Sequence, residues 1–276
     1  MKWTQILKLA LKEDIGKGDI TTTTVIPENA IGEAVIVAKE KGILAGGKIA
    51  NEIFKLLDPN IKFTQVVKDG TKFKSGDTLF EIAGKLSAIL TAERTVLNFL
   101  QHLSGVATLT NKFVEKVKGT GVKILDTRKT IPGLRELEKY AVRCGGGENH
   151  RMGLWDMVLI KDNHIKAVGG IGEAMSKIRG RKLKLKVEVE VRNLEELKEA
   201  LNHSIDRIML DNMSINEIRR GVALVKSSKS RVELEVSGGV NLSNVRTIAM
   251  TGVDYISVGV LTHSVLSIDM SLKVKW

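Results

Sequence analysis

The chain has 276 residues, of which 43% are hydrophobic, 27% are charged and 4% are aromatic, and its formal net charge is +11. This length is sufficient for a sizeable core and predicts about two domains. No run of about 18 uncharged apolar residues occurs, so we expect no membrane-spanning helix. The single cysteine, Cys144, excludes an internal disulfide framework and indicates a reducing, cytoplasmic location.

The positive charge is compatible with two kinds of partner, nucleic acid or small acidic molecules. Aromatic side chains for stacking on single strands are scarce. The sequence also contains no block of Lys and Arg of the kind found in basic arms. Positive residues are spread along the chain and recur beside glycines, which favours anionic small substrates over nucleic acid.

The N-terminal sequence MKWTQILKLALKEDIG resembles a signal peptide only superficially. Lys8 and Lys12 interrupt its apolar stretch, and no small-residue cleavage site follows. We therefore predict a short amphipathic helix.

Residues 32–84 contain β-rich runs separated by turn signals such as Asp69-Gly70, which predict a small, mostly antiparallel sheet. From residue 85 to about 118, apolar residues recur at helical spacing and predict packing helices, broken only at Gly105.

The second half repeats a unit in which a short hydrophobic run ends in polar or glycine residues and a helical pattern follows. The six runs are KILDTRK, MVLIKDN, LKVEVEV, RIMLDN, VELEVSGG and YISVGV. Strands that alternate with helices predict a parallel sheet, here curled into a barrel. The expected fold class is α/β: an N-terminal domain over residues 1–109 and an incomplete, six- to seven-stranded parallel α/β barrel over 110–276. The extreme C-terminus is expected to pack back on the N-terminal domain.

Polar side chains follow every one of these runs. They are Asp126, Arg128 and Lys129; Lys161, Asp162 and Asn163; Glu190; Asp211 and Asn212; Ser237, Gly238 and Gly239; and Gly259. The carboxyl ends of the strands in a parallel barrel meet at one face, where the chemistry of such proteins takes place. A solvated loop explains any one of these residues, but it explains poorly why every strand ends this way.

The residues expected at the site form three groups: cations, carboxylates and glycine-containing turns. Its cations, Arg128, Lys129, Arg151 and Lys161, are sufficient to hold a multiply charged anion. Glu190 and Asp211 fit either Mg²⁺ or sugar hydroxyls. The glycine-containing turns at 237–239 and 257–259 suit a phosphate. Together these features predict a phosphorylated sugar that meets an acidic co-substrate.

The sequence suggests no covalent nucleophile. Cys144 lacks the neighbours of an activated thiol, whereas His150 and His263 could donate hydrogen bonds at the site. The stretch CGGGENHRMG, residues 144–153, has two readings. It is either a helix C-cap followed by a solvated loop, or a bare backbone that lets His150 and Arg151 approach an anion.

The sequence DTRKTIPGLRELEKYAVRCGGGENHRMGLWDMVLIKDNH, residues 126–164, closely resembles the signature of the nicotinate-nucleotide pyrophosphorylase (carboxylating) family, also called quinolinate phosphoribosyltransferase. EDIGKGDITT, TAERTVLNFLQHLSGVAT, KVEVEV, IMLDNM, EVSGGV and GVDYISVGVLTHS extend the resemblance over nearly the whole chain. Ile131 departs from the pattern, which usually has a second Thr there, and we expect little effect.

The resemblance implies an N-terminal α/β sandwich, a short-stranded barrel and a homodimer or higher oligomer. It also implies a transferase of NAD biosynthesis that uses Mg²⁺ and converts quinolinate and phosphoribosyl pyrophosphate to nicotinate mononucleotide, pyrophosphate and CO₂. Lys129, Lys161, Glu190 and Asp211 would be catalytic, and the two carboxylates would serve Mg²⁺, directly or through phosphoribosyl pyrophosphate.

The resemblance also implies which residues bind each substrate. Arg128, His150, Arg151 and Lys161 would surround the quinolinate carboxylates, and Arg94 would reach the quinolinate of a neighbouring subunit. The 5′-phosphate would lie at the two glycine-containing turns. The full expected substrate-binding set is Arg94, Thr127, Arg128, Lys129, His150, Arg151, Lys161, Glu190, Asp211, Ser237, Gly238, Gly239, Val258, Gly259 and His263.

Three alternatives stay open at this point. One is a related phosphoribosyltransferase that acts on nicotinate or another aromatic acid without decarboxylation. A second is a paralogue associated with molybdenum uptake. The third, suggested only by the net charge, is a nucleic-acid-binding protein.

Overall fold

The computed structural model describes residues 3–181, 183–228 and 231–275, and the chain divides into two compact units. The first unit contains the described residues of three segments, Met1–Asn111, Thr130–Gly146 and Leu261–Trp276. The second contains those of Lys112–Lys129 and Gly147–Val260.

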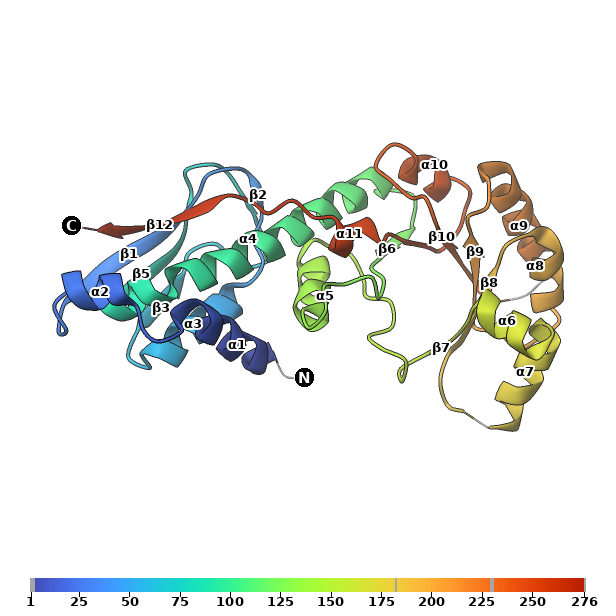
Figure 1. Cartoon of the computed structure of the whole chain (residues 1–276). Helices are drawn as coiled ribbons and strands as arrows, with labels where there is room; N and C mark the ends of the chain where they lie inside the picture. The colour runs from blue at the N-terminus through green and yellow to red at the C-terminus, as the bar shows by residue number, and fades with distance from the viewer. Residues whose placement is uncertain (1–2, 182, 229–230, 276) are drawn as a thin grey trace. The chain divides into compact units, whose positions relative to one another are not determined.

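The first unit is built on a four-stranded antiparallel sheet with strand order β12-β1-β5-β3 (Figure 1). The strands are β1 (Ile31–Ala38), β3 (Lys62–Gln65), β5 (Thr78–Lys85) and β12 (Met270–Lys275), and a short ribbon joins β2 (Gly42–Ile43) to β4 (Lys72–Phe73). The antiparallel sheet predicted for residues 32–84 is therefore confirmed. Strand β12 comes from the other end of the chain and pairs with β1 from Glu33↔Lys275 to Ala38↔Met270.

Helices of the first unit bury apolar faces in its core. They are α1 (Trp3–Ile15), α2 (Ile20–Val25), α3 (Gly47–Leu57) and α5 (Arg135–Cys144), with most of α4 (Leu86–Val117) and α11 (Val260–His263). The amphipathic helix predicted at the N-terminus is confirmed by α1, which buries Leu7 and Leu11; its first two predicted residues lie outside the described range. In the core, the ring of Phe63 lies 5.9 Å from that of Phe54 and 5.1 Å from that of Phe80.

The break predicted at Gly105 is wrong, because α4 runs continuously for 32 residues. A Cβ atom at Gly105 would lie 2.4 Å from the carbonyl oxygen of Leu266. The glycine is needed for this close backbone contact, although a glycine inside a helix costs about 1 kcal/mol relative to alanine.

The second unit contains a six-stranded parallel sheet of order β6-β11-β10-β9-β8-β7. The strands are β6 (Lys123–Leu125), β7 (Val158–Ile160), β8 (Val187–Val191), β9 (Arg207–Asp211), β10 (Glu233–Ser237) and β11 (Tyr255–Ser257). All six predicted strands are confirmed. Among the described residues β6 and β7 do not pair with each other, so the barrel is incomplete; a single parallel bridge joins Leu125 to Glu148.

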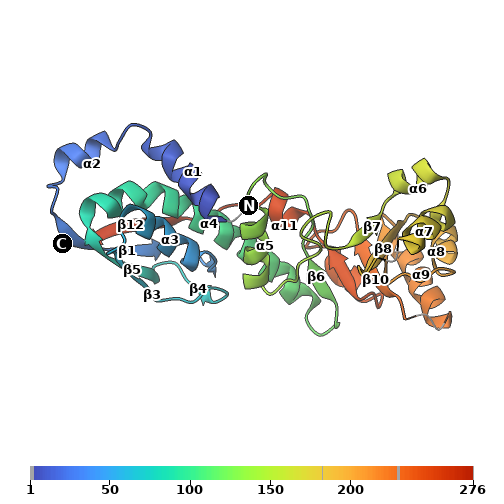
Figure 2. The same ribbon diagram turned by 90° about the horizontal axis from the view of Figure 1, so that it is seen from below.

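Five helices follow the strands of this sheet. They are α6 (Asp162–Val168), α7 (Ile171–Gly180), α8 (Leu194–Ala200), α9 (Ile215–Ser227) and α10 (Val245–Ala249). In both views α7, α8 and α9 lie on the same side of the sheet (Figures 1 and 2). Polar side chains cap the N-termini of α8 and α9. The Asn193 side chain accepts from the Glu196 N–H, and the Ser214 side chain accepts from the Glu217 N–H. Because all six strands are parallel, their carboxyl ends share one edge.

None of the described helices is both long enough and apolar enough to cross a membrane.

Candidate active site

Most of the predicted site residues lie in the second unit, at or just after the carboxyl ends of its strands. Asp211 and Ser237 end β9 and β10, Lys161 follows β7, and Glu190 is the fourth residue of β8. The second-unit set is Thr127, Arg128, Lys129, His150, Arg151, Lys161, Glu190, Asp211, Ser237, Gly238, Gly239, Val258 and Gly259, whereas Arg94 and His263 belong to the first unit.

A buried carboxylate and a partly exposed ammonium group form the clearest ion pair of this edge. The Lys161 Nζ donates to the Glu190 Oε2 at 2.8 Å, and the Glu190 side chain is 7% exposed. The backbone of Lys161 is fixed as well, because its N–H donates to the His164 Nδ1 at 2.9 Å at the start of α6. The ammonium group is therefore held where a second anion could share it.

Asp211 follows Glu190 around this edge, on the neighbouring strand β9. Burial and the negative charge of Glu190 raise the pKa of Asp211 above its ordinary value. Asn212 donates to the Asp211 Oδ2 at 2.8 Å, which partly offsets this effect. Two carboxylates that repel each other in this way are a suitable environment for a cation or for sugar hydroxyls.

The turn after β10 contains two successive glycines, so no side chain of these residues restricts access to its backbone. Gly238 and Gly239 both have positive φ, at 91° and 62°. A Cβ at Gly238 would lie 2.1 Å from the Asn212 Oδ1, so only glycine fits there. The side chain of Asn244 donates to the Gly239 carbonyl at 2.9 Å and fixes the turn.

The second glycine-containing turn is less open. Val258 is fully buried and donates its N–H to the Leu125 carbonyl at 2.9 Å, so this N–H holds β11 beside β6. Gly259 is partly exposed.

The basic residues after β6 and before β7 are close enough to repel each other. Burial and the positive charge of Arg128 lower the pKa of Arg151. The Arg151 Nη1 donates to the Met157 carbonyl at 3.2 Å. Lys129 is exposed, and its N–H donates to the Thr127 hydroxyl at 3.0 Å. Two partly buried guanidinium groups this close favour binding of an anion with more than one negative charge.

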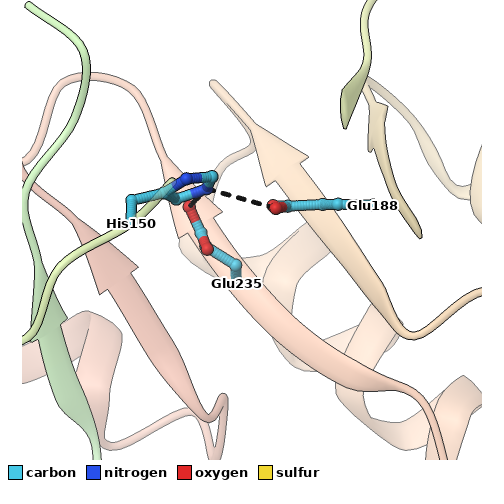
Figure 3. Close-up of side chains that lie close together, drawn as sticks. All are labelled: His150, Glu188 and Glu235. Carbon is cyan, nitrogen blue, oxygen red and sulfur yellow. Dashed lines mark ion pairs between the residues drawn. The ribbon is translucent and has the colours of Figure 1, made fainter. Parts of the chain in front are cut away.

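Three buried side chains of the second unit, His150, Glu188 and Glu235, lie close together (Figure 3). The His150 Nε2 lies 3.1 Å from the Glu188 Oε2 on β8 and 3.6 Å from the Glu235 Oε1 on β10. Glu235 also accepts from the Ser257 hydroxyl at 2.5 Å and from the Arg207 Nη1 at 3.0 Å. We call these five residues the interior charge cluster.

Two carboxylates of the interior charge cluster are fully buried. Burial raises the pKa of Glu188 to about 7, and burial together with the charge of Glu188 raises the pKa of Glu235 to about 7. Neither residue is among those predicted from the sequence. The signal was present in VEVEV and ELEVS, where glutamates alternate inside strands of a sheet that helices cover.

The remaining predicted residues lie in the first unit. Arg94 is exposed on α4 and lines a pocket of about 330 Å³ with Asp14, Asp19 and Thr91. His263 is exposed at the end of α11 and contacts the Ser264 hydroxyl at 2.6 Å. Burial raises the pKa of the Cys144 thiol to about 11, so it is not an activated nucleophile at neutral pH.

The glycine run after Cys144 begins as a helix C-cap, the first part of one of the two readings. It does not continue as a solvated loop, because Gly147 and His150 are buried. Gly145 caps α5, and a Cβ there would lie 2.4 Å from the Ala107 carbonyl. This glycine permits close packing of α5 on α4. Gly146 has a positive φ of 87° and ends the helix.

A parallel α/β sheet with cations, carboxylates and a bare glycine turn at one edge defines an enzyme class that binds phosphorylated and carboxylated ligands. Residues 19–104 match the family model of the quinolinate phosphoribosyl transferase N-terminal domain, and residues 106–273 match that of the C-terminal domain. The chain therefore belongs to the quinolinate phosphoribosyl transferase family.

Individual relatives support this membership. The chain is 46% identical to quinolinate phosphoribosyltransferase [decarboxylating] 2b of Nicotiana tabacum, over 98% of this chain and 81% of that protein. It is also 46% identical to a probable nicotinate-nucleotide pyrophosphorylase [carboxylating] of Bacillus subtilis, over 95% of this chain and 90% of the relative. The solved nicotinate-nucleotide pyrophosphorylase of Francisella tularensis has 45% identity and a TM-score of 0.92, over 99% of this chain and 95% of that chain.

Proposed function

We propose that this protein converts quinolinate and phosphoribosyl pyrophosphate to nicotinate mononucleotide, pyrophosphate and CO₂. The family membership over nearly the whole chain supports this reaction. The observation that carries it within the site is the mutual repulsion of Arg128 and Arg151. A dicarboxylate such as quinolinate relieves this repulsion, whereas the monocarboxylate nicotinate offers one charge fewer.

The residues at the strand ends act by positioning and by charge stabilisation. Arg128, Arg151 and Lys161 would hold the two carboxylates so that the pyridine nitrogen faces the anomeric carbon of the ribose. The nitrogen lone pair forms the new bond while pyrophosphate departs with the electrons of the C–O bond. The 2-carboxylate then leaves as CO₂, the pyridinium ring accepts the electron pair, and a proton from solvent replaces the carboxylate.

Mg²⁺ fits the carboxylate part of the site. Glu190 and Asp211 are adjacent, and the charge of Glu190 raises the pKa of Asp211, so a cation there would relieve repulsion. We infer that these two residues hold Mg²⁺, directly or through phosphoribosyl pyrophosphate. When bound, the ion neutralises charge on the departing pyrophosphate. Lys161, which also donates to Glu190, and the exposed Lys129 would supply the remaining positive charge.

The Ser237–Gly239 turn is the proposed site of the 5′-phosphate, because two successive glycines leave its backbone accessible. Gly259 would border the same phosphate. His263 and Thr127 are proposed as additional substrate contacts through hydroxyl or imidazole hydrogen bonds.

We infer that the enzyme is at least a homodimer and that Arg94 completes the quinolinate site of a neighbouring subunit. Arg94 is exposed, and no ion pair of its side chain occurs among the residues that the structure describes. A reducing compartment such as the cytoplasm suits the single thiol of Cys144.

The direct test is to mix the protein with Mg²⁺, phosphoribosyl pyrophosphate and quinolinate and to measure nicotinate mononucleotide and CO₂ together. We expect equal amounts of both products. A parallel reaction with nicotinate in place of quinolinate tests the non-decarboxylating alternative, and faster turnover of nicotinate would overturn the proposed function. A gel shift with duplex and single-stranded DNA tests the nucleic-acid alternative, for which we expect no salt-resistant binding.

A further inference from the structure

The backbone that carries Arg151 is fixed by side chains rather than by a helix or strand. The Arg151 N–H donates to the His150 Nδ1 at 2.7 Å. The His150 N–H donates to the Asp126 Oδ1 at 2.9 Å, and Asn149 donates to the other oxygen of Asp126 at 2.5 Å. Because the Nδ1 accepts a hydrogen bond, it carries no proton, and the proton of the neutral His150 ring is on the Nε2.

The Nε2 edge of His150 is directed at the interior (Figure 3). It lies within ion-pair distance of Glu188 and Glu235, whose side chains are 1% and 0% exposed. Ser257 and Arg207 in turn fix Glu235. Both edges of the ring thus face protein groups, and the His150 side chain is only 6% exposed. This arrangement differs from that of a histidine presented to a ligand.

We propose that Glu188 and Glu235 are positioning residues for Arg151, acting through His150. The two carboxylates hold the ring by its Nε2 edge, and the ring holds the Arg151 backbone by its Nδ1 edge. The backbone from which the Arg151 side chain extends is thereby fixed. The consequence for substrate affinity rests on the proposed function, because it takes quinolinate as the ligand of Arg151.

A bound metal ion is the competing explanation for three such side chains. The ligand atoms of His150, Glu188 and Glu235 all lie within 4.8 Å of one another. However, both oxygens of Glu235 already accept hydrogen bonds, one of them from the cationic Arg207. A divalent cation would also require the proton to leave the His150 Nε2 and would repel Arg207. These contacts of Glu235 therefore disfavour a metal ion. The contact between the His150 Nε2 and Glu188 is at ion-pair distance, 3.1 Å, and among the described residues the structure gives neither Glu188 oxygen a hydrogen-bond partner.

The ring itself can be tested without any substrate. Two-bond ¹H–¹⁵N correlations at pH 7.5 identify the protonated nitrogen of each of the five histidines, and the His150→Gln variant identifies the His150 signal. We expect a neutral ring with its proton on the Nε2. A proton on the Nδ1, in a neutral or a charged ring, would overturn the proposal, and so would one equivalent of bound metal lost in Glu188→Leu.

The link to Arg151 is tested by direct binding of quinolinate to Glu188→Leu and Glu188→Gln. Gln can still accept from the Nε2–H, whereas Leu cannot. We expect quinolinate Kd to rise about tenfold in Glu188→Leu, the scale of one lost hydrogen bond, and to stay within about threefold of wild type in Glu188→Gln. The Kd of phosphoribosyl pyrophosphate should change less than twofold in both.

Simple electrostatics predicts the opposite sign. Removal of a negative charge beside Arg151 and Lys161 would tighten the binding of a dianion in both variants. Equal or tighter binding in Glu188→Leu would therefore overturn the positioning role. Glu233→Gln is the matched control, because Glu233 also pairs with Arg207, at 3.2 Å, and its ion pairs do not include His150. It should leave quinolinate Kd unchanged.

The two proposals fail in different ways. If wild-type protein does not bind quinolinate, the proposed function is wrong, while the ring tautomer still decides whether the carboxylates position His150. If wild type binds quinolinate but the ring has the other tautomer, only the positioning role is wrong.

Discussion

At the scale of single residues, Arg128 and Arg151 place two positive charges close enough to repel each other. Burial and the neighbouring positive charge both lower the pKa of Arg151. The Arg151 backbone N–H donates to the His150 ring and its guanidinium group donates to the Met157 carbonyl, while the charges of Glu188 and Asp156 act on its pKa in the opposite direction. An anionic substrate would add further negative charge beside these two guanidinium groups.

Arg151→Lys tests whether the planar fork of the guanidinium group matters. Lys retains the charge but loses two parallel hydrogen bonds to a carboxylate. We expect quinolinate kcat/KM to fall about tenfold to a hundredfold, equivalent to roughly 1.5–3 kcal/mol. Arg151→Ala should be worse. Tm should hardly change in either variant, and near-normal kinetics in Arg151→Lys would remove Arg151 from the site.

Glu235→Gln tests the buried carboxylate by its pH dependence. The pKa of Glu235 is raised from 4.5 to about 7 in the folded protein. Its contribution to stability is therefore fully present below about pH 4.5 and is lost as pH rises through about 7, up to about 3 kcal/mol. We expect the urea-unfolding free energy of wild type to fall relative to that of Glu235→Gln between pH 5 and pH 8.

Glu233→Gln is the control for this experiment, because its shift has the opposite direction. Burial opposes the change, but hydrogen bonds from Tyr255 and Arg207 lower the pKa of Glu233 overall. The free energy of wild type relative to Glu233→Gln should rise as pH increases through the carboxylate range. The same slope in both pairs would show that the Glu235 carboxyl is not protonated near neutral pH.

At the scale of elements, hydrophobic periodicity predicted the strands of the second unit more reliably than local rules predicted the roles of two glycines. Six hydrophobic runs correctly identified β6–β11 because each is a short apolar segment followed by a polar end. Gly105 and Gly145 were interpreted from local rules, as a helix break and as a cap or bare loop. Each also accommodates a carbonyl group from a segment distant in sequence, and local rules carry no information on such contacts.

The candidate site was predictable to a similar degree. Charged residues at strand ends stood out because the carboxyl ends of parallel strands share one edge. Glu188 and Glu235 lie inside strands, and their significance depends on cross-strand partners, Arg207 and Ser257, that only the sheet order brings together. The hydrogen bond from the Val258 N–H to the Leu125 carbonyl could not be predicted from the sequence either.

Gly105→Ala tests the close contact inside α4. Helix propensity alone favours Ala by about 1 kcal/mol. The added Cβ would lie 2.4 Å from the Leu266 carbonyl oxygen, so we expect net destabilisation of about 1–3 kcal/mol. Gly180→Ala in α7 is the matched control, since nothing lies within 4 Å of its Cβ. Its Tm should stay the same or rise; equal shifts in both variants would contradict the role assigned to Gly105.

At the scale of the whole molecule, proposed site residues are divided between two units. Arg94 lies in the first unit, and Lys129 lies in the second. Both side chains are exposed, so neither is needed to build a core. We propose that Arg94 serves the site of a neighbouring subunit, and a mixing experiment can test this.

Mixing the inactive variants Arg94→Ala and Lys129→Ala tests that arrangement. In a mixed dimer, one site would carry both changes and the other would carry neither. We therefore expect activity to recover to about a quarter of wild type when subunits exchange at random, where half of the dimers are mixed and each has one intact site. Native mass spectrometry can confirm the exchange. Exchange without recovery would place Arg94 in the site of its own subunit.

The pairing of β12 with β1 has a consequence for the newly made chain. Residues 270–275 are translated long after β1, β5 and β3, so the edge of β1 is uncovered while more than half of the protein is synthesised. The second unit, by contrast, contains no residue beyond 260. Until the last strand leaves the ribosome, β1 is an open template for other chains, and chaperone binding is best placed to protect it there.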